Sequence, residues 1–219
     1  MKKVFCAIFF AFSLFSVNAQ GIVTARSFFD SVSDVYASVR DYEADIDIRA
    51  NRQNMSGRVF FKRPNLLRID FTNPSEQVIC FNGDMLTIYL PGSSAILNQS
   101  VQNSGANMVS PQGLSLMSKY YSVAYETGFE SVPLSDDDPT PVIKLRLGRK
   151  NTSEAFRYIK LAVDANSKLI RRIEGITPQG ESFVFSFKNY ELNKGISDNK
   201  FVYDAPSSAN NYNNFLFNE

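Results

Sequence analysis

Residues 57–91 read GRVFFKRPNLLRIDFTNPSEQVICFNGDMLTIYLP, and this stretch decides the fold. Its runs of β-branched and aromatic residues are separated by residues that favour turns. Such runs predict consecutive antiparallel strands. The turn sequences between them are Lys62-Arg63-Pro64-Asn65, Asn73-Pro74 and Asn82-Gly83.

The apolar residues of this stretch occupy both faces of the predicted strands. Leu67 and Ile69 lie on one face of their strand, but Leu66 lies on the other, and residues 78–81 have no polar face at all. A sheet with one wet face alternates cleanly between apolar and polar residues. We therefore expect this sheet to be covered on both sides, by a helix on one side and by a candidate ligand on the other.

The N-terminus has the pattern of a secretory signal peptide, residues 1–19. Positively charged Met1-Lys2-Lys3 precedes an apolar run from Val4 to Val17, and Val17-Asn18-Ala19 fits a cleavage site. The run is too short for a stable membrane span, so we favour a cleaved peptide over a permanent anchor. Cys6 lies inside the run and would leave with it. The pattern predicts export to the periplasm.

The charge and cysteine content of the mature chain argue against a nucleic-acid partner and against an internal disulfide. Loss of Lys2 and Lys3 lowers Lys+Arg from 23 to 21 against 22 acidic residues, so the net charge becomes −1. Nucleic-acid binding requires a concentrated basic face, and we expect no nucleic-acid partner. Cys80 is then the only cysteine, so no internal disulfide is expected and the fold depends on core burial. Its apolar neighbours predict a buried, unreactive thiol.

The missing residue types argue against catalysis. The chain has no histidine, which removes the usual general base, the Ser-His and Cys-His pairs and the commonest metal ligand. Its 11 glycines are scattered and form no phosphate-binding loop. Asp136-Asp137-Asp138 lacks the spaced ligands of a calcium loop, and we interpret it as a solvated loop. The sequence nominates no catalytic residue, no cofactor and no metal, although a carboxylate pair formed only in space stays open.

Apolar periodicity predicts a long helix followed by a series of strands. Residues 24–39 show the i, i+3, i+4, i+7 spacing of an amphipathic helix, with Thr24 as N-cap. From Tyr42 the period falls to two, which indicates strands. A short second helix is predicted where Ser110 precedes Pro111. Strands are predicted at 42–48, 53–62, around Leu67, Ile79 and Ile88, and at 95–101, 123–129, 141–148, 156–163, 169–177 and 181–190.

About ten or eleven strands with two helices predict an α+β protein that is mainly β. We expect a strongly curved antiparallel sheet, an incomplete barrel, that wraps around the N-terminal helix. Residues 20–205 are predicted as one half-barrel domain, followed by a polar, loosely ordered tail at 206–219. The 19 phenylalanines form a large interior, and any part left unfilled by helices would suit acyl chains. From the residues alone, a plain core is the favoured interpretation.

Residues 57–91 also resemble the LolA family, the periplasmic outer-membrane lipoprotein carriers. The family pattern is a strand ending in KRP, an apolar strand, a DG turn and an L-W-x-Y-x-P strand. The corresponding residues here are Lys62-Arg63-Pro64, Asn82-Gly83 and Leu86–Pro91, with Thr87 in the place of the tryptophan. The signal peptide, the leading helix and the later strands fit the same layout, so the resemblance covers most of residues 20–205.

The resemblance implies a non-enzymatic carrier and names the residues involved. An incomplete barrel closed by the N-terminal helix and short lid helices would hold the acyl chains of a lipoprotein. The carrier would take this cargo from an inner-membrane ABC transporter and pass it to an outer-membrane acceptor; we expect a monomer. By position, Arg63 would hydrogen-bond the lid and hold it closed, because a guanidinium can donate to several carbonyls. The cavity residues would be Val59, Phe61, Leu67, Ile69, Phe71 and Ile88, and the lid residues Gly113, Leu114, Leu116 and Met117.

The resemblance also predicts how cargo is exchanged. Cargo binding would open the lid and replace lid–cavity contacts by lipid–cavity contacts, so that affinity stays moderate and handover is downhill. Three alternatives are left. The acceptor class LolB is itself a lipoprotein, whereas this chain has no cysteine at the cleavage site. The others are a periplasmic lipid-binding sensor or lipid or glycolipid carrier of the same fold, and a periplasmic hydrolase, which the lack of histidine disfavours.

Overall fold

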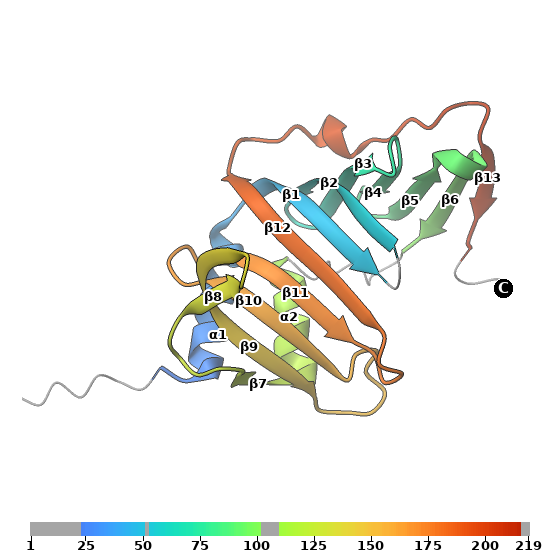
Figure 1. Cartoon of the computed structure of the whole chain (residues 1–219). Helices are drawn as coiled ribbons and strands as arrows, with labels where there is room; N and C mark the ends of the chain where they lie inside the picture. The colour runs from blue at the N-terminus through green and yellow to red at the C-terminus, as the bar shows by residue number, and fades with distance from the viewer. Residues whose placement is uncertain (1–22, 51–52, 102–109, 216–219) are drawn as a thin grey trace, which may run out of the picture.

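One large sheet organises the structure (Figure 1). The computed structural model describes residues 23–50, 53–101 and 110–215. The strands are β1 (Asp41–Ala50), β2 (Gln53–Lys62), β3 (Leu66–Asn73), β4 (Val78–Phe81), β5 (Met85–Leu90), β6 (Ala95–Ser100), β7 (Tyr121–Tyr125), β8 (Val132–Ser135), β9 (Asp138–Arg149), β10 (Tyr158–Asp164), β11 (Ile170–Ile176), β12 (Ser182–Leu192) and β13 (Asn210–Asn213).

The strands follow the order β13-β6-β5-β4-β3-β2-β1-β12-β11-β10-β9-β7, and β8 also pairs with β9. Among the described strands, β13 and β6 pair in parallel and the other pairings are antiparallel. The sheet curves strongly around two helices, which lie behind it in Figure 1. We call the face that carries the helices the inner face and the opposite face the outer face. The predicted curved antiparallel sheet is therefore confirmed.

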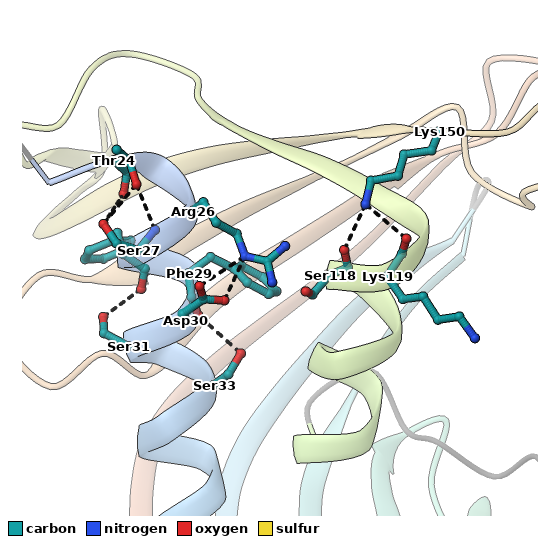
Figure 2. Close-up of polar contacts among 11 residues, drawn as sticks. Thr24, Arg26, Ser27, Phe29, Asp30, Ser31, Ser33, Ser118, Lys119 and Lys150 are labelled. Carbon is teal, nitrogen blue, oxygen red and sulfur yellow. Dashed lines mark hydrogen bonds and ion pairs between the residues drawn. The ribbon is translucent and has the colours of Figure 1, made fainter.

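The first helix, α1 (Ala25–Ser38), confirms the predicted amphipathic helix and its cap. The Thr24 side chain accepts a hydrogen bond from the N–H of Ser27 at 3.0 Å, which satisfies one of the free donors of the first turn (Figure 2). An ion pair between Arg26 and Asp30 lies on the exposed side. The apolar side faces the sheet and buries Phe28, Phe29, Val32 and Tyr36.

The second helix, α2 (Pro111–Tyr120), is also as predicted. Ser110 is its N-cap and accepts a hydrogen bond from the N–H of Gly113 at 3.0 Å, and Pro111 occupies the first turn. The helix runs without a loop into β7, because Tyr121 ends α2 and begins the strand. α2 is thus joined to the sheet at its C-terminal end.

The strand predictions are confirmed for most of the chain, with three differences. The strand expected at 123–129 is β7, which begins two residues earlier and ends at Tyr125. β8 was not predicted; it forms a hairpin with β9 whose turn is Asp136-Asp137, so the acidic run is the turn itself. β13 was not predicted either, and lies in the segment expected to be a loosely ordered tail. Its four residues are all exposed, so no apolar alternation marks it.

The core lies between the two helices and the inner face of the sheet. The strands that contribute to it are β1, β2, β3, β7 and β9–β12. Phe29 and Val32 of α1 and Leu114 of α2 are fully buried in it. Two tyrosines bind the backbone of Ile170. The Ile170 N–H donates to the hydroxyl of the buried Tyr36 of α1 at 3.0 Å, and the hydroxyl of Tyr190 of β12, at the margin of the core, donates to the Ile170 carbonyl at 2.8 Å. Burial raises the pKa of Tyr36 to about 12, so it stays a neutral hydrogen-bonding group.

A C-terminal strap, residues 194–209, crosses the outer face of β2–β5 before the chain enters β13. It includes a short 3-10 helix, η2 (Asp198–Phe201). Figure 1 shows the strap running from the end of β12 over β3 to the far edge of the sheet. The Asp41 carboxylate accepts hydrogen bonds from the Gly195 N–H at 3.2 Å, and the Lys62 amine donates to the Ile196 carbonyl at 2.7 Å. These contacts fix the start of the strap.

Apolar and charged contacts hold the middle of the strap. Phe201 is 1% exposed, and its carbonyl accepts a hydrogen bond from the Cys80 thiol at 3.2 Å. Asp70 binds Arg68 at 2.6 Å and Lys200 of the strap at 2.8 Å. Cys80 is therefore buried beneath the strap, and burial raises its pKa, as expected for an unreactive thiol.

Candidate functional site

An apolar row crosses the inner face from β1 to β6. Residues that are paired between neighbouring strands share a face, so the pairing register places six side chains side by side. All of them are aliphatic. The aliphatic row consists of Ala44, Val59, Ile69, Ile79, Ile88 and Leu97.

A second apolar row lies next to the aliphatic row on the same face. It begins with aromatic residues at β1 and ends with an amide at β6. Neither row contains a carboxylate, an amine, a guanidinium or a thiol. The neighbouring row consists of Tyr42, Phe61, Leu67, Phe81, Leu86 and Gln99.

Burial changes along the aliphatic row. Val59 is 2% exposed and belongs to the core under the helices, whereas Ile88 and Leu97 are half-buried and lie outside that core. Leu86 of the neighbouring row is half-buried as well. We call the part of the inner face over β1–β3 and β9–β12 the packed half. The half-buried residues over β4–β6 form the open half: Ile79, which packs against the core, Leu86, Ile88 and Leu97. Phe81 and Gln99 of the neighbouring row are buried beside them.

The six predicted cavity residues fall into both halves. Val59, Phe61, Ile69 and Phe71 are buried in the packed half. Leu67 packs at the margin of the core. Ile88 is the one residue of the six that lies in the open half. Sequence reasoning missed Ile79, Leu86 and Leu97. The Asn82-Gly83 turn fixes the register that pairs Ile79 with Ile88 and Phe81 with Leu86.

The predicted lid residues lie on two sides of α2. Gly113, Leu114 and Met117 face the core and are buried there. Leu116 is 42% exposed and lies on the outward side of the helix. Helical periodicity explains the difference, since residues three apart share a face and residues two apart do not.

The C-terminal end of α2 is held by Lys150 (Figure 2). The Lys150 amine donates hydrogen bonds to the carbonyls of Ser118 at 3.2 Å and Lys119 at 3.0 Å, and its backbone N–H donates to the Tyr120 carbonyl at 3.0 Å. These carbonyls are among the last ones of the helix, which have no partners within the helix itself. Because β7 follows at once, α2 is fixed to the sheet at this end.

Arg63 lies at the exposed turn between β2 and β3. Its backbone N–H donates to the Arg40 carbonyl at 2.9 Å. Within the described ranges, its side chain forms no hydrogen bond and no ion pair, so a contact with α2 stays a prediction. The preceding Lys62 instead binds the strap, at Ile196 and Asp198. Two members of the KRP motif thus differ in what they contact.

The described residues contain neither a metal-binding cluster nor a membrane-spanning helix. No group of three or more cysteine, aspartate or glutamate side chains in residues 23–50, 53–101 and 110–215 could hold a metal ion. None of the helices in those ranges has the length and hydropathy to cross a bilayer.

Comparison with known proteins finds relatives over most of the chain. The sequence model described as "Outer membrane lipoprotein carrier protein LolA" matches residues 47–204. The outer-membrane lipoprotein carrier protein of Actinobacillus pleuropneumoniae serotype 7 is 25% identical over 196 residues, which cover 85% of this chain and 92% of the relative. The protein of the same name from Serratia proteamaculans is 25% identical over 214 residues, covering 95% of this chain and 97% of the relative.

Solved structures share the fold at lower identity. An uncharacterized conserved protein from Thermus thermophilus superposes with a TM-score of 0.57 at 13% identity, covering 86% of this chain and 98% of that one. A chain of the Pseudomonas aeruginosa MucA/MucB complex gives a TM-score of 0.53 at 9% identity, covering 82% of this chain and 61% of that one. At these identities the likeness concerns the fold.

Proposed function

The chain belongs to the LolA family of outer membrane lipoprotein carrier proteins, and we propose that it carries lipoproteins by binding their acyl chains on the open half of its inner face. The observation that carries this proposal is the aliphatic row, which passes from the buried Ile69 through Ile79, at the margin of the core, to the half-buried Ile88 and Leu97. Its charge-free surface suits an apolar ligand and offers no group for catalysis. Its action is therefore that of a carrier.

Apolar burial supplies the binding free energy in this proposal. Each acyl methylene removed from water contributes about 0.8 kcal/mol. A surface of aliphatic side chains has no hydrogen-bonding pattern to match, so it accepts acyl chains of different length. Ile79, Ile88 and Leu97 lie on adjacent strands, about 5 Å apart, so a chain lying across β4–β6 would contact all three.

We propose that α2 is the lid and that it opens from its N-terminal end. Leu114 and Met117 pack on the core, so displacement of α2 would uncover apolar surface for cargo. The hydrogen bonds from Lys150 and the direct continuation into β7 support the C-terminal end as the fixed one. In this mechanism the acyl chains replace the helix, and the similar apolar burial keeps the exchange close to balanced.

The cellular route follows from the family and from the signal-peptide pattern. We propose that the mature protein works in the periplasm, receives lipoproteins from an inner-membrane ABC transporter and delivers them to an outer-membrane acceptor. Residues 1–19, which carry that pattern, lie outside the described part of the chain.

The test uses the chain without its signal peptide and inner-membrane vesicles that contain a radiolabelled acylated lipoprotein and its ATP-driven transporter. Native mass spectrometry should detect a soluble 1:1 complex formed only with ATP. Ile88→Asp places a charge on the open half and should abolish the complex, whereas Ser100→Asp, at an exposed outer-face position of β6, should leave it intact. A protein that stays empty, or carries only free phospholipid, would refute lipoprotein transport and favour the lipid-carrier or sensor alternative.

The lid role of Arg63 needs its own experiment. If Arg63 stabilises the closed form, Arg63→Leu should retain cargo and slow its transfer to the acceptor. Arg157→Leu, at another exposed arginine, is the matched control and should transfer at the normal rate. Normal transfer by Arg63→Leu would exclude the lid role and leave the acyl-binding proposal untouched.

A further inference from the structure

A groove lies on the outer face, on the opposite side of the sheet from the open half. It has a volume of about 550 Å³ and runs between the β8–β9 hairpin and the strands β11, β12 and β1. The hairpin is held over the outer face by Leu134, which packs on Val142 and Ala162. Nothing in the acyl-chain mechanism uses this groove.

Four cations line the groove: Arg49, Arg171, Arg172 and Lys188. Within the described ranges none of them is in ion-pair contact with a carboxylate. On the same face, Arg58 in contrast binds three carboxylates at 2.8 to 3.2 Å. The groove therefore brings together four cations that have no carboxylate within ion-pair distance in the described part of the chain.

A β-bulge brings two of these cations together. Consecutive residues of a regular strand point to opposite faces, so Arg171 would point to the core if Arg172 points outward. The register between β10 and β11 shifts at Ala162, and Arg171 is the extra residue. Both arginines consequently line the same groove. Bulges commonly re-aim side chains in this way beside functional sites.

Both arginines have an unsatisfied donor. The Nε atoms of Arg171 and Arg172 are screened from solvent and have no hydrogen-bond partner in the described part of the chain. Buried polar groups are nearly always paired, so an arrangement with two adjacent exceptions needs an explanation. An anion in the groove supplies one, because it would draw the guanidinium groups outward and pair with their Nε and Nη edges.

The acidic residues of the groove define the charge of that anion. Asp47, Asp137 and Asp138 line it beside the four cations, which leaves a formal charge of +1. Asp138 is already engaged, since it accepts a hydrogen bond from the Thr140 N–H at 3.0 Å. A single negative charge matches the groove better than a dianion does. We infer that this outer-face groove, built by the β11 bulge, binds a phosphodiester group.

A phosphodiester can belong to a lipid headgroup or to a soluble molecule, and two probes distinguish these sources. Glycerophosphoglycerol, measured by calorimetric titration, reports binding of the free diester. Cosedimentation with phosphatidylglycerol vesicles, against vesicles of an uncharged galactolipid, reports binding of the headgroup in a bilayer. Saturable binding of the diester supports the groove as a site for soluble ligands, and binding of the anionic vesicles alone supports a headgroup site. Absence of both would overturn the inference.

Variants locate the binding. Arg171→Met and Arg172→Met keep the apolar stem but remove the guanidinium, and each should weaken binding at least tenfold. Because each removes an unsatisfied donor, the melting temperature should stay equal to or above that of the wild type. Arg146→Gln, on the outer face but outside the groove, should bind normally. Equal weakening by Arg146→Gln would show a nonspecific charge effect, and a lowered melting temperature would show that the arginines are structural; either result contradicts the site.

Discussion

The aliphatic row passes through two regions that differ in what covers them. In the packed half, Val59 contacts a core closed by α1 and α2. In the open half, Ile88 and Leu97 belong to the same row and are equally apolar, yet they stay half-buried. β4 and β5 are stabilised from behind instead, by the C-terminal strap on the outer face: Cys80 of β4 donates to the Phe201 carbonyl, and the Tyr89 ring of β5 packs against the Tyr203 ring. The surface that stabilises β4 and β5 is thus separate from the apolar surface that we propose for acyl chains.

Truncation of one side chain in each half tests this difference most strongly. Phe29→Ala removes a fully buried ring of the packed half and should lower the free energy of unfolding by about 3–5 kcal/mol. Ile88→Ala removes a half-buried side chain, and its cost should stay below about 2 kcal/mol. Urea unfolding of both variants measures the difference. Equal losses would mean that the open half is as closely packed as the core.

The tyrosine hydroxyls of the packed half give a smaller effect. Tyr36→Phe leaves the buried N–H of Ile170 without its acceptor, which should cost about 1–3 kcal/mol of unfolding free energy. Tyr89→Phe removes a hydroxyl behind the open half, and should cost about 0.5 kcal/mol or less. Comparison of the two urea midpoints checks the prediction. A similar midpoint for Tyr36→Phe and the wild type would show that Ile170 finds another partner.

The charged contacts of the strap give the smallest effect and depend on pH. Burial raises the pKa of Asp70, but hydrogen bonds from Lys200 and Arg68 outweigh it, so the pKa lies below its ordinary value. A carboxyl with a lowered pKa in the folded state stabilises the protein above the pKa of the unfolded state, and this contribution is lost as the pH falls through the folded pKa. Stability should therefore decline as the pH falls below about 4.

Asp70→Asn isolates that contribution. The variant should be less stable than the wild type at pH 7 by about 1 kcal/mol or less, because the two ion pairs are partly exposed. The difference should shrink as the pH falls below about 4, where the wild type loses its charge too. Thermal melts between pH 3 and 7 (a range that spans this window) measure it. A difference that does not change with pH would assign the effect to packing.

Local sequence patterns predicted the helices and strands that bury one face, and the strands that are buried on both faces. The helical spacing of Phe28, Val32 and Tyr36 predicted α1, and the runs around Ile69 and Ile79 predicted adjacent strands. β13 escaped prediction because its side chains are polar and exposed, so its pairing with β6 leaves no apolar alternation. β8 escaped because it is four residues long and contains Pro133.

The candidate site was predicted less completely than the fold. Alternation shows that Val59, Ile69 and Ile88 share a face, but it does not show which of them a helix covers. That depends on the placement of α1 and α2, which is set by contacts far apart in the sequence. The groove beside Arg171 could not be predicted either, because the alternation of neighbouring residues does not reveal a β-bulge.

The central position of β1 has a consequence for the order of folding. β1 pairs on one side with β2, the next strand in sequence, and on the other with β12, so that Tyr42 lies opposite Leu192. The strap adds further long-range contacts, such as that between Cys80 and Phe201. A chain with such distant pairings has a high contact order and folds slowly. The pairing of β1 with β12 cannot form until residues 182–192 are available, so the sheet is completed late in folding.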